Sequence, residues 1–153
     1  MVLNRIIAVA LVLLVCATGN TAAELIITDG DSLILDGERI RLFGIDAPEG
    51  GQRCKDARGL EYDCGASATA ALVKIIAGQP VRCDPQDRDR YRRSVSTCYA
   101  GNVDIGAEMV RQGHALAFIR YSTRYVGLEA EARAAGRGMW AGTFEPPWDW
   151  RRR

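Results

Sequence analysis

The stretch DGDSLILDGERIRLFGIDAPE, residues 29–49, decides the fold that we expect for this chain. Two short runs that contain apolar residues, 32–35 and 38–45, flank Asp36-Gly37. Asp-Gly in that setting is a strong signal for a two-residue β-hairpin. The stretch therefore predicts two antiparallel strands with acidic residues at their ends.

The remaining pattern alternates short strands with helices. Asp104 is a suitable N-cap for one helix, and Ser122 or Thr123 for the last one. Five or so short strands with helices packed on them suggest a small closed barrel, and an OB-type barrel fits that count. The expected strands or extended segments are 25–27, 81–83, 95–99 and 115–119, the helices are 65–77, 104–112 and 126–137, and the loops are 49–64 and 84–93.

The composition is that of an ordinary globular protein of one domain. Of 153 residues, 48% are hydrophobic and 25% are charged, which excludes a disordered chain, a collagen-like repeat and a multi-span membrane protein. The formal net charge is +1. Because the chain has no overall basic field, binding to a polyanion requires a local constellation of charges.

The first residues have the pattern of a secretory signal. Arg5 precedes an unbroken apolar run, 6–15, and small residues follow it. The run is too short for a spanning helix, which needs about 20 residues. We expect a signal peptide at 1–23 and a domain at 24–153 without a membrane span, hence a periplasmic or secreted protein. A buried core helix and lipidation at Cys16 are the alternatives for this segment.

Four cysteines remain after that cleavage: Cys54, Cys64, Cys83 and Cys98. An even number in a small exported chain indicates two disulfides. Of three possible pairings we favour Cys54–Cys64 and Cys83–Cys98, because each closes a local loop. A four-cysteine zinc site is the alternative, and it is disfavoured because zinc ligands usually include cysteines two to four residues apart.

One set of charged residues carries the chemistry. Arg41 stands between apolar neighbours in a predicted strand, where a long cation is costly unless it meets a carboxylate or a phosphate. Asp31 and Asp46 lie on turns or strand ends, where carboxylates can converge on a cation. Oxygen ligands without histidine suit calcium or magnesium rather than zinc. Glu49 is placed to activate water, so the set could hold and hydrolyse a phosphodiester.

Four motifs in order resemble the staphylococcal nuclease-like (thermonuclease) family, and the resemblance runs over residues 25–140. Asp-Gly-Asp alone is weak evidence, whereas all four motifs at similar spacing are specific together. They are Asp29-Gly30-Asp31-Ser32, Arg41 with Asp46-Ala47-Pro48-Glu49, Asp89-Arg90-Tyr91-Arg92-Arg93, and Met109-Val110-Arg111-Gln112-Gly113.

The resemblance implies an α+β fold, a five-stranded OB-type β-barrel with three helices. It also implies calcium-dependent cleavage of DNA and RNA, which makes these nucleic acids the expected partners and Ca²⁺ the expected cofactor. By position, Asp31 and Asp46 would bind calcium through their side chains. The backbone carbonyl of Ala47 would be a further ligand.

The same resemblance implies roles for five more residues. Arg41 and Arg93 would bind the phosphate and stabilise the pentacoordinate state, and Glu49 would act as the general base on water. Tyr91 and Tyr121 would border the nucleotide site. We expect a monomer without a stable protein partner.

The chain departs from the family pattern at two of these places. Arg92 stands where the family often has Gly, which tolerates left-handed backbone that Arg does not favour. Whether Arg92 or Arg93 reaches the phosphate stays open at this point. Ala47 replaces a family threonine, which matters little if only its carbonyl binds metal.

Other interpretations of the same residues remain. The chain could be a non-catalytic OB-fold module of the cell envelope that binds nucleic acid or oligosaccharide, or a disulfide-stapled structural protein. Arg41 and Glu49 could form a structural salt bridge. The four aromatic residues between 140 and 150 are expected to pack on the body. Arg151-Arg152-Arg153 is expected to form a solvated end, with contact to phosphate as the alternative.

Overall fold

A computed structural model describes residues 23–153 of the chain. The predicted signal peptide, except for its last residue, lies outside the described residues. Within residues 23–153, no helix combines the length and the apolar character that crossing a membrane requires.

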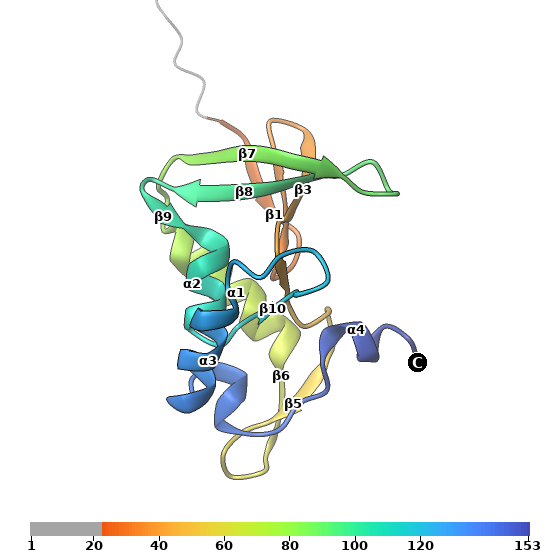
Figure 1. The fold of residues 1–153 in the computed structure, drawn as a ribbon, viewed down its shortest axis with the longest axis vertical. Helices are drawn as coiled ribbons and strands as arrows, with labels where there is room; N and C mark the ends of the chain where they lie inside the picture. Colours follow the sequence, from red (N-terminus) through yellow and green to blue (C-terminus); the bar gives the residue numbers. More distant parts are fainter. Residues whose placement is uncertain (1–22) are drawn as a thin grey trace, which may run out of the picture.

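Short strands and helices alternate along the chain, and Figure 1 shows the helices below a sheet that crosses the top of the molecule. The strands are β1 (Leu25–Ile27), β2 (Ser32–Leu35), β3 (Glu38–Leu42), β4 (Ile45–Asp46), β5 (Arg53–Lys55), β6 (Glu61–Asp63), β7 (Val81–Arg88), β8 (Ser94–Ala100), β9 (Val103–Asp104) and β10 (Leu116–Ala117). The helices are α1 (Cys64–Ile76), α2 (Ile105–Arg111), α3 (Val126–Ala134), the 3₁₀ turn η1 (Gly138–Ala141) and α4 (Pro147–Trp150).

The predicted hairpin forms the centre of the sheet. β2 and β3 pair antiparallel with Leu35 opposite Glu38, and Asp36 and Gly37 between them adopt φ values of 50° and 80°. Both positive values are those of a type I′ turn, which Asp-Gly favours. The second run ends earlier than predicted, because Gly44 with φ 74° separates β3 from β4.

The main sheet follows the order β1-β2-β3-β8-β7, with β9 added on β8. β3 runs parallel to β8, and the other pairs are antiparallel. The α+β class is confirmed. The sheet is not closed as a barrel would be, because no ladder joins β1 to β7 within residues 23–153. The outer half of β7 is exposed and charged, and a charged edge strand disfavours pairing with a further strand.

The three predicted helices are present as α1, α2 and α3, and α4 is an additional one. Asp104 caps α2 as expected, since its carboxylate accepts a hydrogen bond of 2.9 Å from the amide of Ala107. The cap expected for α3 is wrong. Tyr125 occupies the N-cap position without a side-chain hydrogen bond, and the hydroxyl of Ser122 accepts instead from Arg124.

The two predicted loops are partly strand. The segment 49–64 contains the β5–β6 hairpin, and β7 extends through Arg88 into the segment predicted as a loop. β5 and β6 have only three residues each, and the outer half of β7 lacks the apolar alternation that predicts a strand. A bridge between Lys55 and Thr143 joins β5 to residues 140–153, which we call the C-terminal segment.

The core lies between the sheet and α1 and α2. Its buried side chains include Leu33, Leu42, Leu72, Ile105 and Met109. A second, smaller cluster contains Cys54, Cys64, Leu116 and Met139, with Tyr62, Trp140, Phe144 and Trp148 packed against it. The aromatic residues of the C-terminal segment therefore pack on the body, as predicted from the sequence.

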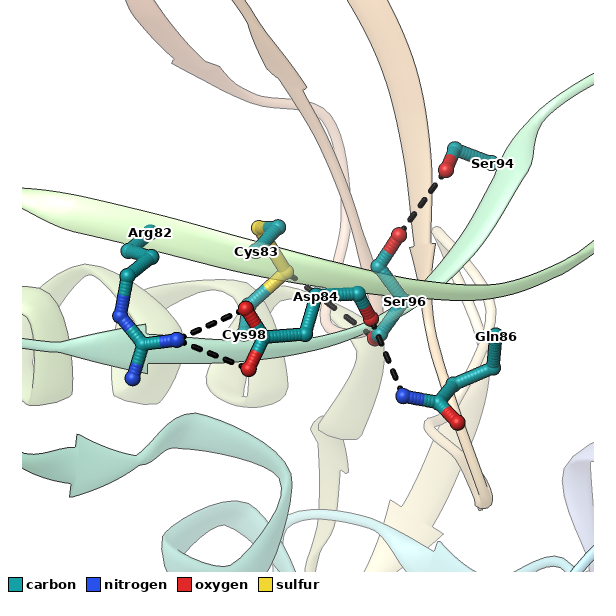
Figure 2. Close-up of a disulfide and its surroundings, with 7 residues drawn as sticks. All are labelled: Arg82, Cys83, Asp84, Gln86, Ser94, Ser96 and Cys98. Carbon is teal, nitrogen blue, oxygen red and sulfur yellow. Dashed lines mark hydrogen bonds and ion pairs between the residues drawn. A yellow bond between two sulfur atoms is a disulfide. The ribbon is translucent and has the colours of Figure 1, made fainter.

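The structure pairs Cys54 with Cys64 and Cys83 with Cys98, the pairing favoured from the sequence. Cys83 and Cys98 face each other across β7 and β8, as Figure 2 shows. Two side chains of β7, Arg82 and Asp84, form an ion pair of 2.7 Å beside this disulfide. The disulfide thus ties an edge strand to a strand inside the sheet.

Replacing both Cys83 and Cys98 with Ser should lower the free energy of unfolding by about 3 kcal/mol, because the bridge closes a loop of 15 residues in the unfolded chain. Urea unfolding of the oxidised wild type and the double variant measures the difference. Equal midpoints and slopes would contradict a stabilising role for this bridge.

Gly65 brings α1 into close contact with the acidic end of the predicted hairpin. A Cβ placed on Gly65 would lie 1.9 Å from the carbonyl oxygen of Glu49. That oxygen also accepts a hydrogen bond of 2.9 Å from the amide of Gln52. Only glycine fits at this position without movement of the Glu49 backbone.

Gly65→Ala should therefore destabilise the protein by about 1–3 kcal/mol and displace Glu49, because backbone atoms cannot yield as a flexible side chain can. Gly50→Ala is the matched control, since nothing lies within 4 Å of a Cβ at that position. Thermal melts of both variants test this. A Gly65→Ala protein as stable as Gly50→Ala would show that the helix tolerates the methyl group.

Candidate active site

The guanidinium of Arg41 lies between two buried carboxylates. Its Nη1 donates to Asp31 at 3.2 Å, and its Nη2 donates to Asp46 at 2.7 Å. Nη2 also lies 3.1 Å from the second carboxylate oxygen of Asp31. The alternative of an Arg41–Glu49 salt bridge is wrong, because the carboxylate of Glu49 pairs with Arg151 instead.

A tight turn between β1 and β2 positions Asp31. The carboxylate of Asp29 accepts a hydrogen bond of 2.9 Å from the amide of Asp31, which shapes the turn locally. A Cβ on Gly30 would lie 2.7 Å from that of Ala68 and 2.8 Å from that of Ala47. The glycine between the two acids thus lets the turn approach α1 and the segment after β4.

The strand β4 brings Asp46 to the same place. Asp46 is completely buried and pairs in register with Leu116 of β10. The amide of the next residue, Ala47, donates to the second carboxylate oxygen of Asp31 at 3.0 Å. Backbone and side chains therefore join the end of β4 to the start of β2, which sets the two carboxylates around one cation.

Glu49 sits at the rim of this site, and a buried glutamine fixes its backbone. The side-chain oxygen of Gln52 accepts from the amide of Glu49 at 3.1 Å, and its side-chain nitrogen donates to the carbonyl of Glu145 at 2.8 Å. The carbonyl of Gln52 in turn accepts from the amide of Cys64 at 3.0 Å. Gln52 thus links Glu49 to both the disulfide segment and the C-terminal segment. We refer to Asp31, Asp46 and Glu49 as the acidic cluster.

Burial dominates the electrostatics of the site. It raises the pKa of Asp31 to about 7, opposed by Arg41 and by the amide of Ala47, and aided by the charges of Asp29 and Asp46. Burial lowers the pKa of Arg41, because it disfavours the charged form. The carboxylates of Asp31 and Asp46 outweigh this effect, so that the pKa of Arg41 is raised overall. Burial thus makes the negative charge of Asp31 costly even beside Arg41.

The second predicted phosphate ligand, Arg93, lies in the loop before β8. Its Nε donates to Asp89 at 2.7 Å, and within residues 23–153 it makes no ion pair with the acidic cluster. Arg92 adopts φ 65°, so the loop keeps a left-handed residue although the side chain is not glycine. Arg93 is mostly buried, whereas Arg92 is exposed.

The two tyrosines assigned to the nucleotide site are exposed, Tyr91 at 58% and Tyr121 at 64%. Arg93 lies over the ring of Tyr91, with 5.7 Å between its guanidinium carbon and the ring centroid. Tyr121 meets Phe118 edge to face at 5.1 Å. Exposed rings of this kind offer surfaces on which a base could stack.

Sequence reasoning missed two residues of the site. Arg151 was expected in a solvated end, but its Nη2 lies 2.8 Å from Asp46 and its Nη1 also pairs with Glu49. Gln52 carried no signal at all, because it stands in a polar, glycine-rich segment. The only hint for Arg151 was its place in a basic run.

The donor atoms have the chemistry that a hard cation prefers. Asp31 and Asp46 offer only oxygen atoms, and the guanidinium that they share shows that both carboxylates already face one positive group. Two side-chain carboxylates are fewer than a closed metal site requires. In the described part of the chain, no three side chains of His, Cys, Asp or Glu lie together in a group that could hold a metal ion.

Comparison with known proteins agrees with the resemblance seen in the sequence. The family model described as "Staphylococcal nuclease homologue" matches residues 39–142. A "Probable staphylococcal-like nuclease CAN2" of Oryza sativa subsp. japonica is 39% identical over 84% of this chain and 33% of its own length. The chain thus spans about a third of that rice relative.

Two bacterial relatives match over most of their length. The "Succinoglycan biosynthesis protein ExoI" of Rhizobium meliloti (strain 1021) is 36% identical over 90% of this chain and 76% of its own. An "Uncharacterized endonuclease" of Escherichia coli O157:H7 is 36% identical over 83% of this chain and 82% of its own. With the family match across residues 39–142, these likenesses establish that the chain belongs to the staphylococcal nuclease-like family.

Proposed function

We propose that this protein is an exported, calcium-dependent endonuclease that hydrolyses phosphodiester bonds of DNA and RNA. The observation that carries the proposal is the guanidinium of Arg41 held by Asp31 and Asp46, with Glu49 three residues further along the chain. Membership of a nuclease family and the likeness to a bacterial endonuclease support hydrolysis as the reaction.

Calcium is proposed as the cofactor because the donors are oxygen atoms at the ends of two strands. Asp31 and Asp46 would hold the ion, with the carbonyl of Ala47 as a further ligand. A bound ion would supply positive charge to an oxygen of the scissile phosphate.

The remaining roles fall to residues of the chain itself. Arg41, oriented by its two carboxylates, would donate hydrogen bonds to phosphate oxygens as negative charge builds up on them. Arg93, beside the exposed ring of Tyr91, would be the second guanidinium. Glu49 would accept a proton from the attacking water, because its carboxylate is at the solvent-exposed rim, 36% exposed.

Export is supported by the two disulfides, which form and persist in oxidising compartments. It is also supported by the signal-like pattern at 1–23 of the sequence. A periplasmic or secreted protein would meet extracellular nucleic acid at calcium concentrations high enough for a weak site.

Purified protein should digest single-stranded DNA in calcium and stop when a chelator is added. With only two side-chain carboxylates for the ion, half-maximal activity should require roughly 10⁻⁴–10⁻³ M calcium, the range of extracellular sites. A gel assay over a calcium series measures this. Equal rates with calcium and with chelator would refute the metal dependence, and tight binding without cleavage would favour the binding-module alternative.

Arg41→Ala and Glu49→Ala should each lower the turnover rate at least about 10²-fold, the size of effect seen when one transition-state stabiliser is lost. Arg39→Ala is the control, since Arg39 lies two residues away in β3 with an exposed side chain. Initial rates of DNA digestion compare the three variants.

Arg41→Ala also leaves Asp31 and Asp46 without their shared partner, so loss of activity through unfolding must be separated from loss of chemistry. Arg41→Lys keeps the charge and loses the bidentate geometry. A melting curve for each variant shows whether the protein is folded, so that the turnover of Arg41→Lys reports on the geometry of the guanidinium alone. A folded Arg41→Lys protein with wild-type turnover would contradict the role given to the guanidinium.

A further inference from the structure

The C-terminal segment places a second guanidinium on the acidic cluster. Nη1 and Nη2 of Arg151 donate to the two carboxylate oxygens of Asp46 at 2.9 and 2.8 Å, and Nη1 also pairs with Glu49. These partners are 105 and 102 residues away in the chain. The side chain is 35% exposed, so it lies at the mouth of the site rather than inside the core.

Several contacts hold the segment in place, so the position of Arg151 does not depend on its ion pairs alone. Pro147 is buried, and Trp148 stacks on Phe118 with the ring planes 8° apart and the centroids 5.7 Å apart. Gln52 donates to the carbonyl of Glu145. Figure 1 shows the segment, in dark blue, crossing β5 before it reaches α4.

The two guanidiniums together occupy the oxygens that a cation would use. Oδ1 of Asp46 accepts from both Arg41 and Arg151, and its Oδ2 accepts from Arg151. The proposed base Glu49 is also engaged by Arg151. A divalent ion bound to these carboxylates would therefore compete with Arg151.

The charges favour such an exchange. With all three carboxylates of the acidic cluster ionised, Arg41 and Arg151 leave one net negative charge on the site. A divalent ion in place of Arg151 would bring the sum to zero. Because Asp31 and Asp46 are buried, an unneutralised charge among them is costly, so a second cation beside Arg41 stabilises them.

We propose that Arg151 is a built-in cation that neutralises Asp46 and Glu49 until a divalent ion displaces it, and that it thereby sets the affinity of the site for calcium. The inference rests on the proposed calcium-dependent function and deepens it. While Arg151 is in place, one carboxylate oxygen of Glu49 is engaged by a guanidinium. Displacement of one side chain would thus couple ion binding to release of the base.

Arg151→Gln removes the charge and keeps most of the side chain, and it should tighten calcium binding roughly tenfold, the effect of losing a competing charged hydrogen bond. Calorimetric titration of the full protein with calcium chloride measures the dissociation constant without reference to activity. Arg152→Gln is the matched control, because it makes the same charge change in the same segment. Arg152 pairs with Asp149 and not with the acidic cluster. It should bind calcium as the wild type does.

Melting curves supply a second readout. Without calcium, Arg151→Gln should melt below the wild type, because buried Asp46 has lost a partner. With calcium, its melting temperature should rise more than that of the wild type, since an ion that binds more tightly stabilises more at the same concentration. Arg151→Lys should fall between the two proteins, because an ammonium group cannot bridge both carboxylates in the same way.

The other outcomes overturn the inference in distinguishable ways. Equal calcium affinity in Arg151→Gln and wild type, with cleavage intact, would overturn the role of Arg151 and leave the proposed function standing. Unchanged calcium affinity with weaker binding of a phosphorothioate oligonucleotide would make Arg151 a phosphate ligand instead. Absence of calcium binding in both proteins would overturn the inference and the calcium dependence together.

Discussion

The guanidinium of Arg41 between Asp31 and Asp46 is the contact on which the rest of the site depends. Two buried carboxylates that face the same group would repel each other, and the arginine between them makes their joint burial possible. The contact also has a topological consequence, because it joins the start of β2 to the end of β4 through the strand between them. Arg41 of the β2–β3 hairpin, which lies at the centre of the sheet, thus holds the acids of the site.

Rigid neighbours convert that contact into a defined site. Gly65 lets α1 approach the backbone of Glu49, and Gln52 joins that backbone to the C-terminal segment. The disulfide between Cys54 and Cys64 closes the segment that carries Gln52. Groups that bind or activate a substrate work best when packing holds them in place. The loop around Glu49, although polar and glycine-rich, is fixed from three sides.

Much of this arrangement is readable in the sequence because it is local. The Asp36-Gly37 hairpin, the three main helices and the Asp104 cap follow from short patterns, and the family match supports the OB-type prediction. The predictions that failed also have a physical cause. The edge strand β7 is charged rather than alternating, so its length was underestimated, and the sheet does not close across it.

By itself, the sequence indicated that Asp31, Arg41 and Asp46 come together and where the central hairpin turns, because all three stand on or beside the same hairpin. Only the tertiary structure decided that Arg151 lies on Asp46 and Glu49, and that Gln52 bridges two segments 93 residues apart. Contacts between such distant residues arise from packing of the C-terminal aromatics on the body. They leave no periodic pattern along the chain.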